Sequence, residues 1–249
     1  MRLTPGIHLV GGGTWGGMGL SPGPDCNCYL IECGGAWVLV DTGSGVGASP
    51  AAIAAHVEAA GASVAGLAAI LLTHMHGDHA GGAAHFAGAS GAPTYASPLA
   101  AEVLASADEM RSSVAAARDA GIYPSDFRLK PLQGIRPLRD GEVLQFGETS
   151  VTAVETPGHC DGHLSFVVSA RGRRDLIAGD AVFWRGRSLV QATSDCDPEA
   201  MAASMLKLAA LSDVDGLFPG HGAFTLTGAK RHLDEAASHA RALRLPPGV

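Results

Sequence analysis

Short apolar runs, separated by glycines and polar residues, recur along both halves of the chain. Runs of this length, rich in Val, Ile, Leu and aromatic residues, predict short β-strands. In the first half, the predicted strands are residues 7–10, 29–32, 36–40, 67–72 and 94–96. In the second half, they are residues 143–146, 151–155, 163–168 and 175–178, followed by an apolar run at 213–218.

Longer segments between these runs predict helices. Ser49 before Pro50 predicts a helix with Ser49 as its N-cap, which Gly61 ends. Ser97 and Pro98 predict a longer helix to about Ala120, followed by an irregular stretch to residue 133. Further helices are predicted at 82–87, 198–211 and 227–243. The alternation of strands and helices predicts an α/β fold.

Composition favours one compact domain over residues 1–249, with a helical insertion at about 97–133. The chain is 47% hydrophobic and 16% charged, which is typical of a globular protein. No stretch approaches the ~20 apolar residues of a membrane span. Residues 1–6 have no uninterrupted apolar core of a secretory signal, so we expect a cytoplasmic protein. Five cysteines without zinc-ribbon spacing suit reduced thiols.

Net charge limits the partners that the chain can bind. The formal charge of −7 argues against broad nucleic-acid binding, which needs a surface rich in Lys and Arg. We therefore expect a small-molecule substrate, with neither nucleic acid nor membrane as partner. The sequence leaves the oligomeric state open, a dimer included.

The strongest chemical signal is the run Thr73-His74-Met75-His76-Gly77-Asp78-His79, which follows the predicted strand 67–72. Imidazoles at positions i and i+2 after a strand can converge on one metal ion. Asp78 and His79 lie about one turn later and can begin a second site. Such a dense run of potential ligands predicts a metal centre.

Three later segments each place one more potential ligand after a strand-like run. Thr156-Pro157-Gly158-His159 follows one run, Ala178-Gly179-Asp180 ends a second, and Phe218-Pro219-Gly220-His221 ends a third. Because strand ends at one rim of a sheet can assemble a site from distant parts of the chain, we expect these residues to join the first cluster.

Together these residues resemble the metallo-β-lactamase superfamily. The matching pieces are the H-x-H-x-D-H run at 74–79, then His159, Asp180 and His221 in that order, with the strand and turn Val38-Leu39-Val40-Asp41-Thr42-Gly43 upstream. The resemblance covers most of the chain, and it implies a four-layer αβ/βα sandwich with two mixed β-sheets. An Asp at position 180 resembles the glyoxalase II-like and lactonase-like branch, because the β-lactamases commonly have Cys or Ser near that place.

The resemblance also implies a dinuclear metal site. It gives one ion to His74, His76 and His159, and the other to Asp78, His79 and His221, with Asp180 bridging them. Two zinc ions are the favoured metal content, and Fe or Mn would also suit these ligands. A shared water, acidified from a pKa of about 15.7 toward ~7, would supply metal-bound hydroxide as the nucleophile. Asp78 would also have a catalytic role, in orienting that hydroxide or relaying its proton.

The implied activity is hydrolysis of a small ester, lactone or thioester. The alternatives are a mononuclear iron sulfur (persulfide) dioxygenase, a β-lactamase-like amide hydrolase, and a phosphodiesterase or ribonuclease. Lactonases of this fold place a tyrosine soon after the bridging Asp, where this chain has Phe183 and Trp184. The glycine-rich segment 11–24 is predicted to lie over the metal site. The candidate substrate-binding residues are Trp15, Met18, Phe183, Trp184, Tyr123 and His163.

Overall fold

The first of two β-sheets has six strands in chain order. The computed structural model describes residues 1–249 except 15, 16, 243, 245 and 249. The strands are β1 (Ile7–Leu9), β2 (Tyr29–Cys33), β3 (Ala36–Val40), β4 (Leu67–Leu71), β5 (Thr94–Ala96) and β6 (Arg136–Pro137). The first three pair antiparallel, and β3 to β6 pair parallel. The sheet is therefore mixed.

The second sheet has five strands, in the order β11-β10-β9-β8-β7. They are β7 (Val143–Phe146), β8 (Thr149–Glu155), β9 (Leu164–Ala170), β10 (Arg173–Gly179) and β11 (Gly216–Pro219). All pairs are antiparallel except β10 and β11, which run parallel. Strands β8, β10 and β11 therefore point the same way, and their carboxyl ends meet at one edge.

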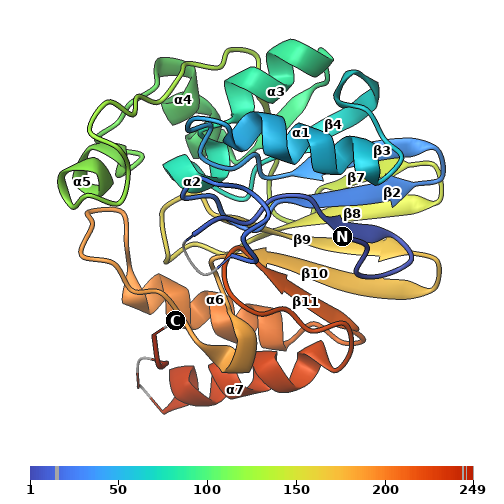
Figure 1. Ribbon diagram of the computed structural model, residues 1–249. Helices are drawn as coiled ribbons and strands as arrows, with labels where there is room; N and C mark the ends of the chain where they lie inside the picture. Colours follow the sequence, from blue (N-terminus) through green and yellow to red (C-terminus); the bar gives the residue numbers. More distant parts are fainter. Residues whose placement is uncertain (15–16, 243, 245, 249) are drawn as a thin grey trace.

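Helices cover the outer face of each sheet. On the first sheet lie α1 (Ser49–Ala59), α3 (Ala83–Ser90) and α4 (Pro98–Ser106), and on the second lie α6 (Pro198–Ala209) and α7 (Ala229–Arg241) (Figure 1). Short helices α2 (Gly77–Ala80) and α5 (Val114–Asp119), with 3₁₀ turns η1 (Val64–Gly66) and η2 (Trp184–Gly186), complete the chain. The layers form the αβ/βα sandwich of the metallo-β-lactamase fold, so the predicted fold class is confirmed.

The alternation of side chains along the strands explains the layers. In β3, Val38 and Val40 face the second sheet and pack with Phe166 and Phe218 in one apolar cluster. Leu39, between them, faces the other way and belongs to the cluster under the helices of the first sheet. Because both faces of the central strands are buried, these strands are continuous apolar runs in the sequence.

Two predictions about helix ends are wrong. The N-cap of α1 is Ala48, and the Ser49 hydroxyl donates a hydrogen bond to the buried carboxylate of Asp25 instead. The predicted helix from 98 to 120 is two helices, since α4 ends where Ala107 adopts a left-handed φ of 52° and α5 begins after Ser113, with φ 56°. The stretch 97–133 forms the crossover between the parallel strands β5 and β6.

Strand β6, which pairs with β5, was not predicted from the sequence. Among the helices of the described residues, none is long and apolar enough to cross a membrane.

Candidate metal centre

The predicted ligands lie after strand ends of both sheets. The run 73–79 follows β4, and α2 begins within it at Gly77. His159, Asp180 and His221 follow β8, β10 and β11, which end at the same edge of the second sheet. The fold therefore brings together all seven predicted ligands from four segments of the chain.

One group of ligand atoms comes from His74, His76 and His159. These side chains are buried, and one donor atom of each lies within 4.8 Å of the other two. His76 Nδ1 and His159 Nε2 are 3.1 Å apart. Three nitrogen donors at this spacing are what one first-row metal ion requires.

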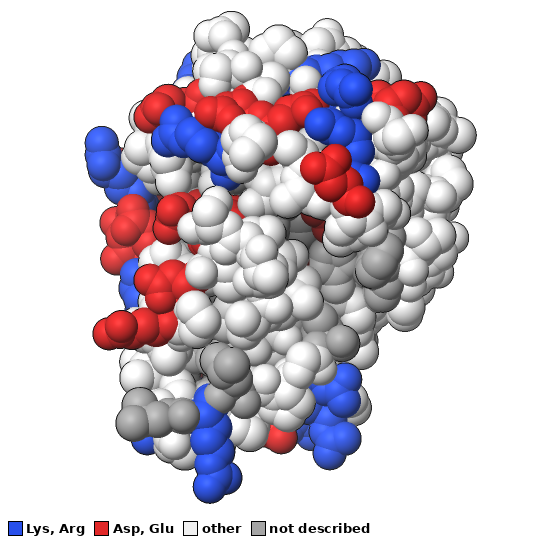
Figure 2. All heavy atoms as spheres, turned by 90° about the vertical axis from the view of Figure 1, so that its left-hand side faces the viewer, with Lys and Arg blue, Asp and Glu red and all other residues white. Residues whose placement is uncertain are grey.

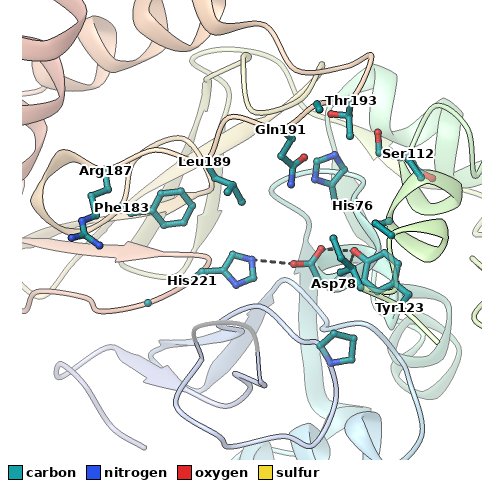
Figure 3. Close-up of a pocket in the computed structure, with 18 of the residues that line it drawn as sticks. His76, Asp78, Ser112, Tyr123, Phe183, Arg187, Leu189, Gln191, Thr193 and His221 are labelled. Carbon is teal, nitrogen blue, oxygen red and sulfur yellow. Dashed lines mark hydrogen bonds and ion pairs between the residues drawn. The ribbon is translucent and has the colours of Figure 1, made fainter. Parts of the chain in front are cut away.

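A second group consists of Asp78, His79 and His221, whose donor atoms also lie within 4.8 Å of one another. The Oδ2 atom of Asp78 is 3.0 Å from His221 Nε2 and 3.6 Å from His79 Nε2. Figure 3 shows Asp78 between His221 and Tyr123, with its carboxylate turned into the cavity. The two oxygens of Asp78 therefore meet different neighbours.

Asp180 lies between the two groups. Its Oδ1 is 3.4 Å from His79 Nε2, and its Oδ2 is 3.4 Å from His159 Nε2 and 3.5 Å from His221 Nε2. Asp180 Oδ1 and His74 Nε2 are both buried, and neither has a hydrogen-bond partner. Because buried polar atoms without partners cost free energy, these atoms fit a site that is completed by metal ions.

Four of the candidate ligands have pKa values that suit cation binding. Burial lowers the pKa of His74 well below its usual range and that of His159 to about 4, although Asp180 opposes the shift at His159. Burial would raise the pKa values of Asp78 and Asp180, but neighbouring imidazoles outweigh it and hold both well below the usual range. Two neutral imidazoles and two carboxylates are thus available as ligands near neutral pH.

A glycine keeps the centre open next to Asp180. A Cβ atom at Gly220 would lie 2.2 Å from Asp180 Oδ1 and 2.6 Å from His79 Cε1. Such approaches are too close for any side chain. Gly220, directly before His221, is therefore a steric requirement of this arrangement.

Sequence reasoning missed two carboxylates that hold the histidines. Asp41 Oδ2 accepts hydrogen bonds from His79 Nδ1 and from Thr73 Oγ1, both at 2.8 Å. Asp195 Oδ2 lies 3.0 Å from His76 Nε2. Carboxylates on the outer nitrogen fix the orientation of a ligand imidazole and raise its basicity. The position of Asp41 after strand β3 was a usable signal, whereas Asp195 stands alone in a polar loop.

His163 contacts the backbone of Asp180 and does not face the cavity. Its Nε2 accepts a hydrogen bond from the backbone N–H of Asp180 at 3.0 Å, so its Nδ1 carries the proton and donates to Thr156 Oγ1 at 2.8 Å. The side chain is buried and does not line the cavity. It therefore helps to orient the loop of Asp180 and does not reach a substrate.

A cavity of about 660 Å³ opens onto His76, Asp78 and His221 (Figure 3). This size is typical of a site for a drug-sized molecule. The other residues that line it are Pro24, Ser112, Ser113, Ala116, Ala117, Ala120, Ile122, Tyr123, Phe183, Trp184, Arg187, Leu189, Gln191, Ala192, Thr193, Gly222 and Ala223. Most of them come from two segments, 112–123 and 183–193, which enclose the space from opposite sides.

Charged side chains surround this face of the molecule and are few at its middle. Helix α5 and the loop after η2 lie on the left of Figure 1, the side that faces the viewer in Figure 2. In Figure 2 the charged side chains gather toward the top, the left edge and the bottom of this face, and its middle is mostly uncharged. The cavity is therefore suited to an apolar molecule.

Some of the predicted substrate-binding residues line the cavity and others do not. Tyr123, Phe183 and Trp184 line the cavity. Met18 does not line it and is 53% exposed, so the structure does not bring Met18 to the cavity. Trp15 lies outside the described residues. Of the described part of segment 11–24, Pro24 alone lines the cavity.

Comparison with known proteins agrees with this geometry. The model of the metallo-β-lactamase superfamily matches residues 22–221. The chain belongs to the metallo-β-lactamase superfamily. Members are metal-dependent hydrolases, which places this chain among such enzymes.

Three relatives within the superfamily show how far the likeness extends. The lactamase-like protein vrtG of Penicillium aethiopicum is 30% identical over 89% of this chain and 58% of its own length. An atrochrysone carboxyl ACP thioesterase of Aspergillus fumigatus is 27% identical over 79% of this chain and 37% of its own. A crystal structure of a metallo-β-lactamase family protein from Thermus thermophilus matches with a TM-score of 0.74 and 26% identity, covering 97% of this chain and 81% of that one. The chain thus spans little more than half of vrtG and less of the thioesterase.

Proposed function

We propose that this protein is a dinuclear metal-dependent hydrolase that cleaves an ester, lactone or thioester with a large apolar group. The observation that carries the proposal is the pair of ligand groups that share Asp180 and open onto one apolar cavity. A centre closed off from the cavity would not admit such a substrate.

Each residue of the centre has a proposed role. His74, His76 and His159 would hold one ion, Asp78, His79 and His221 the other, and Asp180 both. Zinc suits this set of nitrogen and carboxylate donors, which Fe or Mn would also accept. When bound, the ions would supply Lewis acidity and an acidified water.

Asp78 has a catalytic role in the proposal besides binding an ion. Asp78 would orient the attacking water or relay its proton, because its carboxylate reaches both the second group and the cavity. Its low pKa keeps this carboxylate ionised at neutral pH.

The cavity walls support an apolar substrate. Ala116, Ala117 and Ala120 line the cavity together with Phe183, Trp184 and Leu189. Figure 3 shows Phe183 and Leu189 across the space from Tyr123. Arg187 is the one Lys or Arg among the described lining residues, and no carboxylate of the described chain pairs with it. A substrate with an apolar body and an anionic group at its outer end would match this distribution.

Thioesters are the first class to test. One relative is named a thioesterase that acts on an acyl carrier protein, although this chain spans only 37% of it. In this chain the open cavity would admit a long acyl chain and its carrier arm. The relative therefore supports thioesters over β-lactams as starting compounds.

The test joins metal analysis to a substrate panel. Protein purified without chelator should contain about two divalent ions per chain, and it should hydrolyse aryl esters, lactones or acyl thioesters faster than β-lactams or phosphodiesters. A fully active protein without metal would refute the proposal. One tightly bound iron, with oxygen consumed in the presence of a persulfide, would replace it with the dioxygenase.

A further inference from the structure

The cavity wall at 97–133 also touches the candidate ligands. Tyr123, which follows α5, is only 5% exposed and reaches Asp78, 45 residues earlier in the chain. Its hydroxyl donates to Asp78 Oδ1 at 2.8 Å and accepts from the Asp78 backbone N–H at 3.0 Å. The two bonds hold both the side chain and the backbone of one ligand.

The division of the Asp78 oxygens follows from this contact. Oδ1 is occupied by Tyr123, while Oδ2 lies 3.0 Å from His221 and faces the second ligand group. A carboxylate without the hydroxyl could rotate about its last bond, and neither oxygen would then be held toward the second group. Tyr123 therefore holds the plane of the carboxylate so that one oxygen faces the second ligand group.

A second contact joins the other end of α5 to the first ligand group. Ser113, directly before the helix, donates its hydroxyl to Asp195 Oδ1 at 2.8 Å. The other oxygen of Asp195 lies 3.0 Å from His76 Nε2, so that His76 Nδ1 points toward His159. Ser113, Asp195 and His76 thus form a chain from the cavity wall to the first group.

The inserted segment is held firmly enough to position these ligands. Arg118 of α5 pairs with Glu109 at 2.7 Å and donates to the carbonyl oxygen of Phe127 at 3.1 Å. The rings of Tyr123 and Phe127 pack against Gly77, where a Cβ atom would come within 3.0 to 3.1 Å of both. The insertion therefore packs tightly against the histidine run.

We infer that the insertion is a working part of the metal centre, in which Tyr123 positions Asp78 and Ser113 positions His76 through Asp195. The inference rests on the proposed dinuclear site. Since Ala116, Ala120 and Ile122 lie between the two contacts and line the cavity, one segment both contacts the substrate and sets a ligand of each ion. Tyr123 and Ser113 are positioning residues under this inference.

The experiment measures the affinity of each ion separately. Metal-free protein is titrated with cobalt(II) in competition with a chromophoric chelator, and absorption spectra follow the two binding steps. Titrations of His74→Ala and His221→Ala assign each step to its ligand group. Tyr123→Phe should weaken binding at the Asp78 group roughly tenfold to a hundredfold, and Ser113→Ala should do the same at the His76 group.

Matched controls separate positioning from general loosening. Tyr95→Phe removes a hydroxyl that accepts a bond from the exposed Arg136, and Ser106→Ala removes one that bonds within α4. Both should leave the two affinities unchanged. Tyr123→Phe should also lower kcat while KM for an apolar substrate stays nearly constant, and Ile122→Ala should raise KM with both ions retained.

The outcomes distinguish a failure of the proposed dinuclear centre from a failure of the positioning role. If wild-type protein binds fewer than two ions, the proposed dinuclear centre is wrong. If wild type binds two ions and each variant keeps both affinities, or loses both equally with a lower melting temperature, the dinuclear centre stands and the positioning role is overturned.

Discussion

The ligand cluster and the cavity walls are built in opposite ways. The proposed ligands His74 and His79 are fully buried and lie in the run that follows strand β4 and enters the short helix α2. The walls are formed by α5, by η2 and by the loop after η2, and Trp184 of η2 is 38% exposed. The difference indicates that the sandwich fixes the chemistry, while its connecting segments select the molecule that reaches it.

Removal of the metal ions should have the largest effect. Dialysis against a chelator should abolish hydrolysis, because the proposed nucleophile is a water that the metal ions acidify. The melting temperature should fall as well, since the ions bind only the folded chain. Added zinc should restore both, and activity that survives complete removal, checked by elemental analysis, would contradict the dinuclear proposal.

Replacement of the shared candidate ligand Asp180 should have the second-largest effect. Asp180→Asn keeps the shape but removes the charge between two dications, so kcat should fall by roughly a hundredfold to a thousandfold with loss of metal. Asp175→Asn, on strand β10 directly upstream of Asp180, removes a carboxylate that pairs with Arg173 and should cost stability without loss of metal. Equal metal content and rate in Asp180→Asn would mean that Asp180 does not join the two ions.

Filling the cavity should change selectivity alone. Ala116→Trp places a large ring on the α5 wall, so kcat/KM should fall about tenfold or more for bulky acyl substrates and remain nearly constant for acetyl esters. Metal content should be unchanged. Asp119→Trp, on the same helix but outside the lining, serves as the control. Equal losses for large and small substrates would show that the acyl group binds elsewhere.

The smallest effect is expected at the outer end of the cavity. Arg187→Ala should raise KM roughly threefold to tenfold for substrates that carry an anionic group, and the increase should shrink at high salt, because this cation is exposed to solvent. Arg185→Ala, whose guanidinium lies over the Trp184 ring and does not line the cavity, is the control. Identical kinetics in Arg187→Ala would exclude an anion site there.

The sequence carried more information about the cluster than about the walls. The run 73–79 has its ligands close together behind an apolar strand, and the later ligands each follow a similar run, so local spacing was enough to predict the cluster. The buried strands could be expected for the same reason, since they are continuous apolar segments, whereas the sandwich was implied by the resemblance to the metallo-β-lactamase superfamily. These features depend on neighbours in sequence.

The walls depend on contacts between distant residues. The break after α4 occurs at Ala107, an ordinary helix former held in a left-handed conformation, so composition gave no signal for it. Tyr123 was predicted to contact substrate, but its hydrogen bonds to Asp78 follow from how the insertion packs on Gly77. Asp195 lies 119 residues from His76, and nothing near it in the sequence indicates that pairing.

The link between the two sheets determines when the centre can form during folding. The ligands of the 74–79 run come from one sheet and those at 159, 180 and 221 from the other. Next to them, Tyr29 of the first sheet donates a hydrogen bond to the carbonyl oxygen of Pro219 at 2.7 Å. Such distant contacts form late, after each half has gained its own structure. We therefore expect metal ions to leave the folding rate almost unchanged and to slow unfolding, because they bind only after the two halves of the chain have come together.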